Sequence, residues 1–292
     1  MSDQPQRPIS ADWLALREPA DTRARDGAAP ALLPALLVTL PRPQDGNTLR
    51  VVDLGAGTGA NLRWLAPRLP FPATDQSWLL VDHDPHLLAR GTGHPEGVRV
   101  ESVRADVTDL ADLLTTGDGT DGAGGAGTDL VTAAALLDLL DTRELTAVVE
   151  AVVDAGVPAL FSLTVDGTAD LDPAEEQDDV LAAAFDAHQQ RDGRPGPGAG
   201  AVVAAMFRER GWRVLTESTP WRLSSADEPQ LVDAWLEGRV EAAVEQDPRL
   251  AGPAASWLGR RRTQALDGQL GVTVGHLDVL AVPDQADVTE RN

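Results

Sequence analysis

The sequence predicts a doubly wound α/β domain, in which helices cover both faces of a mostly parallel sheet. From residue 49 onward, short apolar runs of strand length alternate with segments of helical periodicity, a pattern typical of such a sheet. The run over 159–165 is apolar almost throughout, as expected of a parallel strand that is buried on both faces. The chain of 292 residues is also long enough to bury a large core.

The expected elements follow one another in a regular order. Before the first strand, the pattern predicts a helix over 11–25 and a shorter helix over 30–40. The strands expected next are 49–54, 77–81, 98–103, 129–132 and 159–165, and the helices expected between them are 61–69, 85–90, 109–114 and 142–155. After an interruption at 166–199, which holds a helix near 180–190, the expected elements are helix 201–210, strand 212–217, helices 228–243 and 249–266, and strand 270–282.

The helix over 142–155 has the clearest boundaries. Asp141 is a good N-cap residue, and Glu144 follows it three residues later, the spacing of a capping box. Gly156 ends the helix, since glycine favours the left-handed conformation that follows a last turn. The Gly-rich stretch 115–128, in contrast, has no apolar face to bury and is expected to form a mobile loop.

The alternation favours one domain with added segments over two independent domains. Residues 1–45 precede the first strand and are expected to form a helical lid. Residues 46–292 would form the α/β domain, with insertions at about 166–199 and 224–266. Because these segments exceed what a bare α/β sheet with its covering helices needs, we expect them to determine specificity.

The composition excludes several chemistries. The chain has no Cys, Lys or Tyr, so disulfides, thiolate metal sites, lysine Schiff bases and phenolic acids or bases are excluded. The histidines show no metal-ligand spacing, and no metal is expected. The formal net charge of −22 opposes binding to nucleic acid or to anionic membranes, and the longest apolar stretch, 28–40, is too short to cross a bilayer. We expect a cytoplasmic protein that acts on a small soluble molecule, and the sequence leaves a homodimer open.

A glycine-rich turn, Gly55-Ala56-Gly57-Thr58-Gly59, lies where the first expected strand ends and a helix begins. Gly55 and Gly57 permit a tight turn and a close approach of the backbone to a ligand. The helix after Gly59 offers the free N–H groups of its first turn. A glycine turn that binds no ligand is the plainer interpretation, so the acidic residues around it decide its meaning.

Three aspartates lie at the ends of the first three expected strands. Asp53 lies two residues before the first glycine, and a buried acid there would repel a pyrophosphate but suits a ligand with a positively charged amino group and sulfonium. Asp82 ends the second strand, where an acid can accept hydrogen bonds from both ribose hydroxyls of an adenosine cofactor. Asp106 follows the third strand, where an acid could accept a hydrogen bond from the adenine amino group.

Together these residues resemble the first three motifs of class I S-adenosylmethionine-dependent methyltransferases, and the likeness covers about residues 45–165. The resemblance implies a Rossmann-like sheet of seven strands, whose last two strands are antiparallel. It implies S-adenosylmethionine as the cofactor, with the three glycines packed under its methionine part. It also implies that Asp53 orients the amino group through water or backbone, that Asp82 binds the ribose and that Asp106 binds the adenine edge. Residues 13–19 are similar to the N-terminal helix of a group of bacterial methyltransferases.

Two other functions remain open on the sequence. The spacing Gly55-x-Gly57-x-x-Ala60 also fits the loose fingerprint of nicotinamide-dependent oxidoreductases, and Asp82 would serve that cofactor equally well. Asp53, the preceding helices and the lack of a Tyr/Lys or Cys catalytic set argue against it. A protein that binds S-adenosylmethionine without catalysis is the other alternative.

Methyl transfer depends mainly on positioning, and it needs a general base only when the acceptor starts protonated. Asp138, after the fourth expected strand, is a candidate catalytic acid that would orient the acceptor. His188, in the insertion, is the preferred candidate for a base, and Gln189 beside it could form a hydrogen bond with the substrate. No Asn-Pro-Pro-Tyr motif follows the fourth strand, so transfer to oxygen is slightly favoured over transfer to nitrogen or carbon.

Further candidates for ligand binding lie outside the motifs. Trp221 and Arg222 follow the sixth expected strand, and such a pair can stack on a planar acceptor and bind an acidic one. Trp235, on the next helix, could line the same cavity. Arg17 could close over the methionine carboxylate of the cofactor, because the chain has no lysine to neutralise it.

Overall fold

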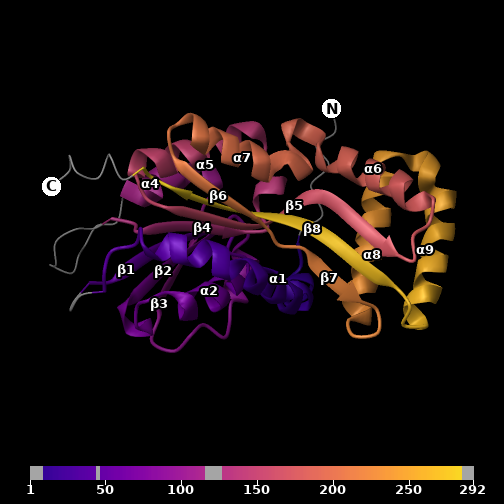
Figure 1. Cartoon of the computed structure of the whole chain (residues 1–292), viewed down its shortest axis with the longest axis horizontal. Coiled ribbons are helices and arrows are strands. Elements are labelled where there is room, and N and C mark those ends of the chain that lie inside the picture. The colour runs from indigo at the N-terminus through magenta and orange to yellow at the C-terminus, as the bar shows by residue number, and fades with distance from the viewer. Residues whose placement is uncertain (1–8, 44–46, 116–126, 285–292) are drawn as a thin grey trace.

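Within residues 9–43, 47–115 and 127–284, which the computed structural model describes, eight strands form one sheet (Figure 1). Their order across the sheet is β3-β2-β1-β4-β5-β8-β6, and β7 pairs with β8 beside this path. The strands are β1 (Leu49–Leu54), β2 (Gln76–Asp82), β3 (Arg99–Arg104), β4 (Leu130–Ala134), β5 (Ala159–Asp172), β6 (Arg213–Ser218), β7 (Trp221–Ser224) and β8 (Gly271–Val282). The first five strands run parallel, whereas β8 is antiparallel to β5, β6 and β7.

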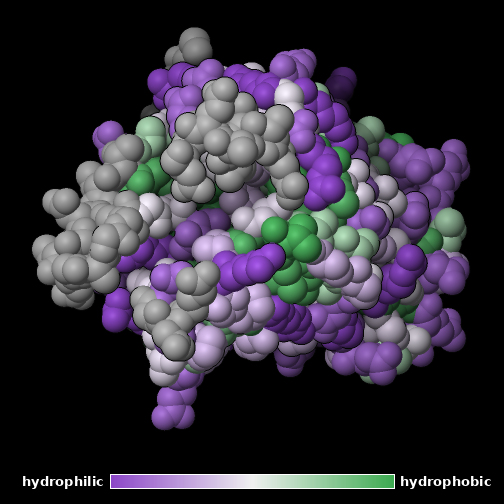
Figure 2. Space-filling model, turned by 60° about the vertical axis from the view of Figure 1, so that its left-hand side comes forward, coloured by the Kyte–Doolittle hydropathy of each residue, from purple (hydrophilic) through white to green (hydrophobic). Residues whose placement is uncertain are grey.

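Helices cover both faces of this sheet, so the predicted doubly wound α/β fold is confirmed, as is the antiparallel pairing of the last strand. In Figure 1, α4, α5 and α7 lie over one face, and α1 and α2 lie over the other. The helices are α1 (Ala11–Leu37), α2 (Ala60–Leu65), α3 (Pro85–Ala89), α4 (Leu110–Thr115), α5 (Thr142–Ala155), α6 (Gln177–Gln189), α7 (Ala199–Glu209), α8 (Pro229–Gln246) and α9 (Ala251–Leu266). Figure 2 shows that polar side chains dominate one face of the molecule, with hydrophobic ones gathered near its middle.

Strand β1 illustrates how the sequence divides the core between the two faces. Val52 and Leu54 belong to the hydrophobic cluster under α4, α5 and α7. Leu49 and Val51 belong to the cluster under α1 and α2, because successive side chains of a strand point to opposite faces. All four side chains are buried, which fixes the strand firmly and places its carboxyl end beside those of β2 and β4.

The two helices expected over 11–25 and 30–40 are one continuous helix, α1, so that prediction was wrong. Its three internal prolines each remove a backbone hydrogen bond, which costs about 3 kcal/mol in an isolated helix. Burial of a stripe against the sheet and the neighbouring strands offsets this cost. The buried apolar positions recur every four residues across the expected break: Ala20, Ala24, Ala28, Leu32 and Leu36.

Strand β5 is twice as long as expected. It was predicted to end at residue 165, but it continues to Asp172 and pairs there with β8 alone, with shifts in register on the way. From Val165 onward, half-buried and exposed side chains alternate, the pattern of a strand with one covered face. The residues that follow the sixth expected strand form a separate strand, β7, which pairs with β8. Most of the loop expected over 115–128 (residues 116–126) lies outside the described residues.

The long arms of β5 and β8 carry a second structural unit, which we call the extension (residues 166–190 and 221–274). It consists of these arms with β7, α6, α8 and α9, which gather in one part of the molecule (Figure 1). A third hydrophobic cluster fills it, and Ala20 and Ala24 of α1 belong to that cluster. Helix α1 also forms an ion pair with α2, through Glu18 and Arg63, and another with the extension, through Arg23 and Glu228. The helix therefore connects the sheet and the extension.

Candidate cofactor and acceptor site

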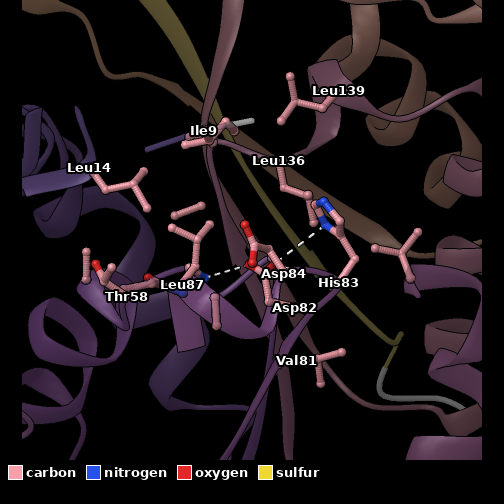
Figure 3. A pocket seen from close by; sticks show the side chains of 18 of the residues that line it. Ile9, Leu14, Thr58, Val81, Asp82, His83, Asp84, Leu87, Leu136 and Leu139 are labelled. Atoms are coloured by element: carbon pink, nitrogen blue, oxygen red, sulfur yellow. Dashed lines mark hydrogen bonds and ion pairs between the residues drawn. The ribbon is translucent and has the colours of Figure 1, made fainter. Parts of the chain in front are cut away.

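A cavity of about 360 Å³ lies at the carboxyl ends of β1, β2 and β4. This is where open α/β sheets bind their ligands, and the volume suits a small molecule. Figure 3 shows Asp82 near the centre of the cavity, with the apolar side chains of Leu14, Leu87, Leu136 and Leu139 around it. The cavity therefore combines a carboxylate with apolar walls.

The glycine turn forms one wall of the cavity. Gly55 and Gly57 line it with φ angles of +58° and +54°, which side chains other than glycine adopt only with strain. The N–H of Gly57 donates to Oδ2 of Asp82 over 2.8 Å, and the N–H of Ala56 donates to the carbonyl of Val81 over 3.0 Å. The turn is thus tied to the end of β2. Gly59 does not line the cavity and serves as the N-cap of α2.

Asp82 and Asp106 both line the cavity, from the ends of β2 and β3. Asp82 is 6% exposed, and its two carboxylate oxygens accept from the N–H groups of Gly57 and Asp84. Each oxygen has a further lone pair, so the carboxylate can still accept from two hydroxyl groups of a ligand. Asp106 is exposed and accepts from the N–H and hydroxyl of Thr108, which lowers the pKa of the Asp106 carboxyl and keeps it ionised.

Asp53 lies beneath the cavity and does not line it. Nδ2 of Asn61 donates to Oδ1 of Asp53 over 2.7 Å and to Oγ1 of Thr132 over 2.9 Å. Oδ1 of Asn61 accepts from Nη1 of Arg25 over 2.9 Å, and both Asn61 and Arg25 line the cavity. Oδ2 of Asp53 is buried and has no hydrogen-bond partner among the described residues. The acid therefore acts on the cavity through Asn61.

Burial raises the pKa of Asp53 from 3.8 to about 7, against the opposing effects of Asn61 and Arg25. The folded state keeps this proton up to about pH 7, whereas the unfolded state releases it near pH 3.8. Between those values the Asp53 carboxyl makes folding less favourable as the pH rises, by at most about 1.4 kcal/mol per pH unit. Asp53→Asn should therefore raise the melting temperature relative to the wild type by more at pH 8 than at pH 5.

Thermal unfolding of the ligand-free protein at several pH values measures this difference. Asp170→Asn, which changes an exposed aspartate of β5, is the matched control and should leave the pH dependence unchanged. Equal pH dependence in Asp53→Asn and the wild type would contradict the buried, protonated state of Asp53.

Two arginines of α1 bring positive charge to the cavity. Arg17 donates twice to the carboxylate of Asp21, from Nε over 2.9 Å and from a terminal nitrogen over 3.1 Å. Arg25 is 1% exposed and stacks on the ring of Trp64, with Cζ 4.5 Å from the ring centre. Burial lowers the pKa of the Arg25 guanidinium, and the carboxylate of Asp21 opposes this shift. The two guanidinium groups can neutralise an anionic ligand group in the cavity.

Behind Arg17 lies a buried aromatic side chain of the extension, Trp221. The guanidinium of Arg17 lies 4.9 Å from the centre of its ring, and the ring Nε1 donates to Oδ1 of Asp21 over 3.0 Å. The ring also packs against Trp13 and His276, at centre distances of 6.5 Å and 5.1 Å. Trp221 does not line the cavity, but it fixes the residues of α1 that do.

Asp138 belongs to a 3-10 helix, η4 (Leu137–Leu139), directly after β4. Its side chain is buried and does not line the cavity, although Leu136 and Leu139 on either side of it do. Burial raises the pKa of Asp138 to about 6, while the positive charges of Arg17 and Arg194 oppose this rise. A carboxyl group with this pKa can exchange a proton near neutral pH.

Four other candidates from the sequence lie away from the cavity. His188 of α6 points its Nε2 toward Oε2 of Glu245, at 3.3 Å, and Gln189 ends the same helix. Arg222 is exposed on β7, and Trp235 lies half-buried on α8. The structure thus brings together Arg17, the glycine turn and the strand-end aspartates, and separates them from these four residues.

Asn61 and Arg25 were not among the sequence candidates, although the sequence carries a signal for each. Asn61 follows the glycine turn by two residues, where a polar side chain at a helix start faces the end of β1. Arg25 lies eight residues after Arg17, with Asp21 between them, so the three share one face of the helix expected over 11–25.

Two features are missing from the part of the chain that the structure describes. No group of three or more His, Asp or Glu side chains there could hold a metal ion. No helix there is both long enough and apolar enough to cross a membrane.

Comparisons with known proteins find similarity only at the level of the backbone. No protein-family model matches the sequence, and no curated protein matches it. The chain is similar to the structure of a cyclopropane synthase from Mycobacterium tuberculosis, with 13% identity, a TM-score of 0.47 and 94% of each chain covered. It is also similar to a mycolic acid cyclopropane synthase complexed with SAH and CTAB (12%, TM-score 0.46, 92% of this chain and 94% of that one).

A further similar structure is that of a phosphoethanolamine N-methyltransferase from Haemonchus contortus in complex with S-adenosylhomocysteine. Here the identity is 14%, the TM-score is 0.41, and the match covers 86% of this chain and 52% of that one. All three likenesses are distant.

Proposed function

We propose that this protein transfers a methyl group from S-adenosylmethionine to a small polar molecule. The observation that carries the proposal is the meeting of three strand ends in one cavity, which presents the Gly55–Gly57 turn, Asp82 and Asp106 together. This order of a glycine turn and two acids suits adenosine, its ribose and an attached amino-acid group. When bound, S-adenosylmethionine supplies a methyl group on a sulfonium, which is reactive without further activation.

Each residue of the cavity has a task in this proposal. The carboxylate of Asp82 accepts from the ribose hydroxyls, and that of Asp106 accepts from the adenine amino group. Arg25 and Arg17 bind the methionine carboxylate, since they are the two arginines among the residues that line the cavity. Asn61, held in place by Asp53 and Arg25, orients the amino group. Residues 1–45 act as the lid of the domain, with α1 closing the cavity through Leu14, Arg17 and Arg25.

The residues near the expected position of the acceptor favour transfer of the methyl group to an oxygen atom. A hydroxyl acceptor must lose a proton, and Asp138 follows β4 beside the cavity with its pKa near 6, close to the value that a general base needs. His188 would serve only after leaving Glu245, and Gln189, Trp221, Arg222 and Trp235 remain candidates for holding the acceptor. The acceptor would enter between η4 and the extension.

Calorimetric titration tests the proposed function. S-adenosylmethionine and S-adenosylhomocysteine should each bind with one site per chain, whereas NAD⁺ and NADP⁺ should give no heat of binding. Incubation of a metabolite extract with a donor labelled on the methyl group should then yield a labelled small molecule. Binding of a nicotinamide cofactor alone would overturn the proposal. Binding of S-adenosylmethionine without any labelled product would favour a protein that binds this ligand without catalysing methyl transfer.

A further inference from the structure

The extension buries a cation, the guanidinium of Arg239, that forms no ion pair with any described residue. Arg239 lies on the buried face of α8, in line with Leu236 and Ala243, and only 5% of it is exposed. Its Nη2 is buried without a hydrogen-bond partner among the described residues, and none of those residues forms an ion pair with it. Arginine is rarely placed at such a position without a partner, because burial removes the hydration of its charge.

Two aromatic rings fix the position of this guanidinium group. Its Cζ lies 4.8 Å from the ring centre of Phe185 on α6 and 5.1 Å from that of Trp235 on α8. Stacking on ring faces stabilises the cation and leaves the N–H groups at its edge free to donate. Both rings are half-buried, so the guanidinium lies close to the surface of the extension. The guanidinium of Arg239 is therefore held in place as a hydrogen-bond donor, and its Nη2 has no acceptor among the described residues.

The nearby carboxylates do not neutralise this charge. Burial lowers the pKa of Arg239 to about 10, and the negative charges of Asp186 and Asp178 only oppose that shift. Asp178 is engaged with Arg261 and Trp257. Asp186 attracts Arg239 across the space between α6 and α8, but the two side chains form no ion pair.

The interior of the extension adjoins the cavity at the strand ends. Ala135 lines that cavity and also packs in the hydrophobic cluster of the extension, together with Ala184 and Trp235. Arg239 itself does not line the cavity, and an acceptor bound at Arg239 would meet the cavity at Ala135.

We propose that Arg239, held between Phe185 and Trp235, binds an anionic group of the methyl acceptor, either a carboxylate or a phosphate. The inference rests on the proposed function and narrows the acceptor to an acid. A planar carboxylate matches the edge of the guanidinium with two parallel hydrogen bonds, and a phosphate offers the same pair of oxygens. Asp186 lies beside this position and weakens the binding of any anion there.

Titration with small aromatic anions tests the site without the methyl donor. The probes are benzoate and phenyl phosphate, with benzyl alcohol as the neutral control. The wild type should bind at least one anion and not the alcohol, and Arg239→Met should bind that anion at least tenfold more weakly. Arg208→Met, at an exposed arginine of α7, should bind like the wild type. The anion that binds more tightly indicates whether the site prefers a carboxylate or a phosphate.

Two results of this titration would overturn the proposal of an anion site at Arg239. One is a wild type that binds neither anion, and the other is an Arg239→Met variant that binds as tightly as the wild type. Because no donor is present, failure of S-adenosylmethionine to bind would refute the proposed function and leave the anion result standing by itself.

Two further measurements separate a binding role from a structural one. Asp186→Asn should strengthen binding of the probe several-fold, because it removes a repelling charge, and unchanged or weaker binding would contradict the placement of the anion. The ligand-free Arg239→Met variant should melt at the same temperature as the wild type or higher, since methionine fills the space between the rings without an unpaired charge. A marked fall in melting temperature would show that Arg239 holds the extension together and would overturn the proposal.

Discussion

Replacing Asp82 by alanine is expected to lower the affinity for S-adenosylmethionine roughly 100-fold, because two hydrogen bonds from ribose hydroxyls to a buried carboxylate disappear together. The same change frees the N–H of Gly57, which in the wild type donates to Oδ2 of Asp82, so the glycine turn loses one of its two hydrogen bonds to β2 and keeps the one from Ala56 to Val81. Isothermal titration calorimetry of the purified variant measures the loss. This is the largest effect on donor binding that we expect from a single substitution.

The ligand 5′-methylthioadenosine, which has the nucleoside but lacks the amino-acid group, refines this test. Asp82→Ala should lower the affinity for 5′-methylthioadenosine by the same factor as the affinity for S-adenosylmethionine, because both ligands present the same ribose. Asp154→Ala, at an exposed position of α5, is the control and should bind both ligands like the wild type. An Asp82→Ala variant that binds the donor with unchanged affinity would remove Asp82 from the site.

Arg25→Met is expected to lower the affinity for S-adenosylmethionine about 50-fold, by removing the charged partner of the methionine carboxylate. Arg25 is better suited to this task than Arg17, whose Nε and one terminal nitrogen already donate to Asp21. The substitution also leaves Oδ1 of Asn61 without its donor, so the free energy of unfolding should fall by about 1–3 kcal/mol. Calorimetry and thermal unfolding report the two effects separately.

The same nucleoside ligand distinguishes a binding role for Arg25 from a purely structural one. If Arg25 binds the carboxylate, Arg25→Met should bind 5′-methylthioadenosine nearly as tightly as the wild type does. Equal losses for the donor and for the nucleoside would mean that Arg25 only supports the cavity through Asn61 and Trp64. The two variants should therefore differ. Asp82→Ala should lower the affinity for both ligands, whereas Arg25→Met should lower the affinity for S-adenosylmethionine alone.

The parallel sheet and the strand-end aspartates could be predicted because their signals are local. A buried parallel strand must be apolar, a sharp turn at φ near +55° requires glycine, and a strand end places the next acid at a known edge of the sheet. Asp82 and Asp106 line the cavity from the positions that the element order gave them. In each case a short stretch of sequence determines the position.

The continuity of α1 could not be predicted, because its stability comes from distant contacts. Pro30 and Pro34 oppose a helix locally, and burial of Leu32 and Leu36 against the sheet outweighs them. The helix expected over 11–25 already places Arg17, Asp21 and Arg25 on one face. The pairing of Arg25 with Asn61 could not be predicted, because it depends on how α1 packs against α2.

The long arms of β5 and β8 also escaped prediction. Asp166-Gly167 interrupts an apolar run and is typical of a turn, yet these residues stay within β5 as an irregularity in its register, because β8 pairs with Val165 before them and with Ala169 after them. His188 and Trp235 were placed near the catalytic centre on the assumption that the insertion folds over it. The arms instead carry α6 and α8 outward, and His188 lies against Glu245.

The double attachment of α1 has a thermodynamic consequence. The helix brings Arg17 and Arg25 to the cofactor side of the cavity, while Asp21 binds Trp221 and Arg23 binds Glu228 of the extension. A ligand that shifts or stiffens α1 from one side changes the free energy of binding on the other side. By linkage, an acceptor that raises the affinity for the donor by some factor must itself be bound more tightly by the same factor when the donor is present. Cooperativity between two substrates can thus arise from a single helix.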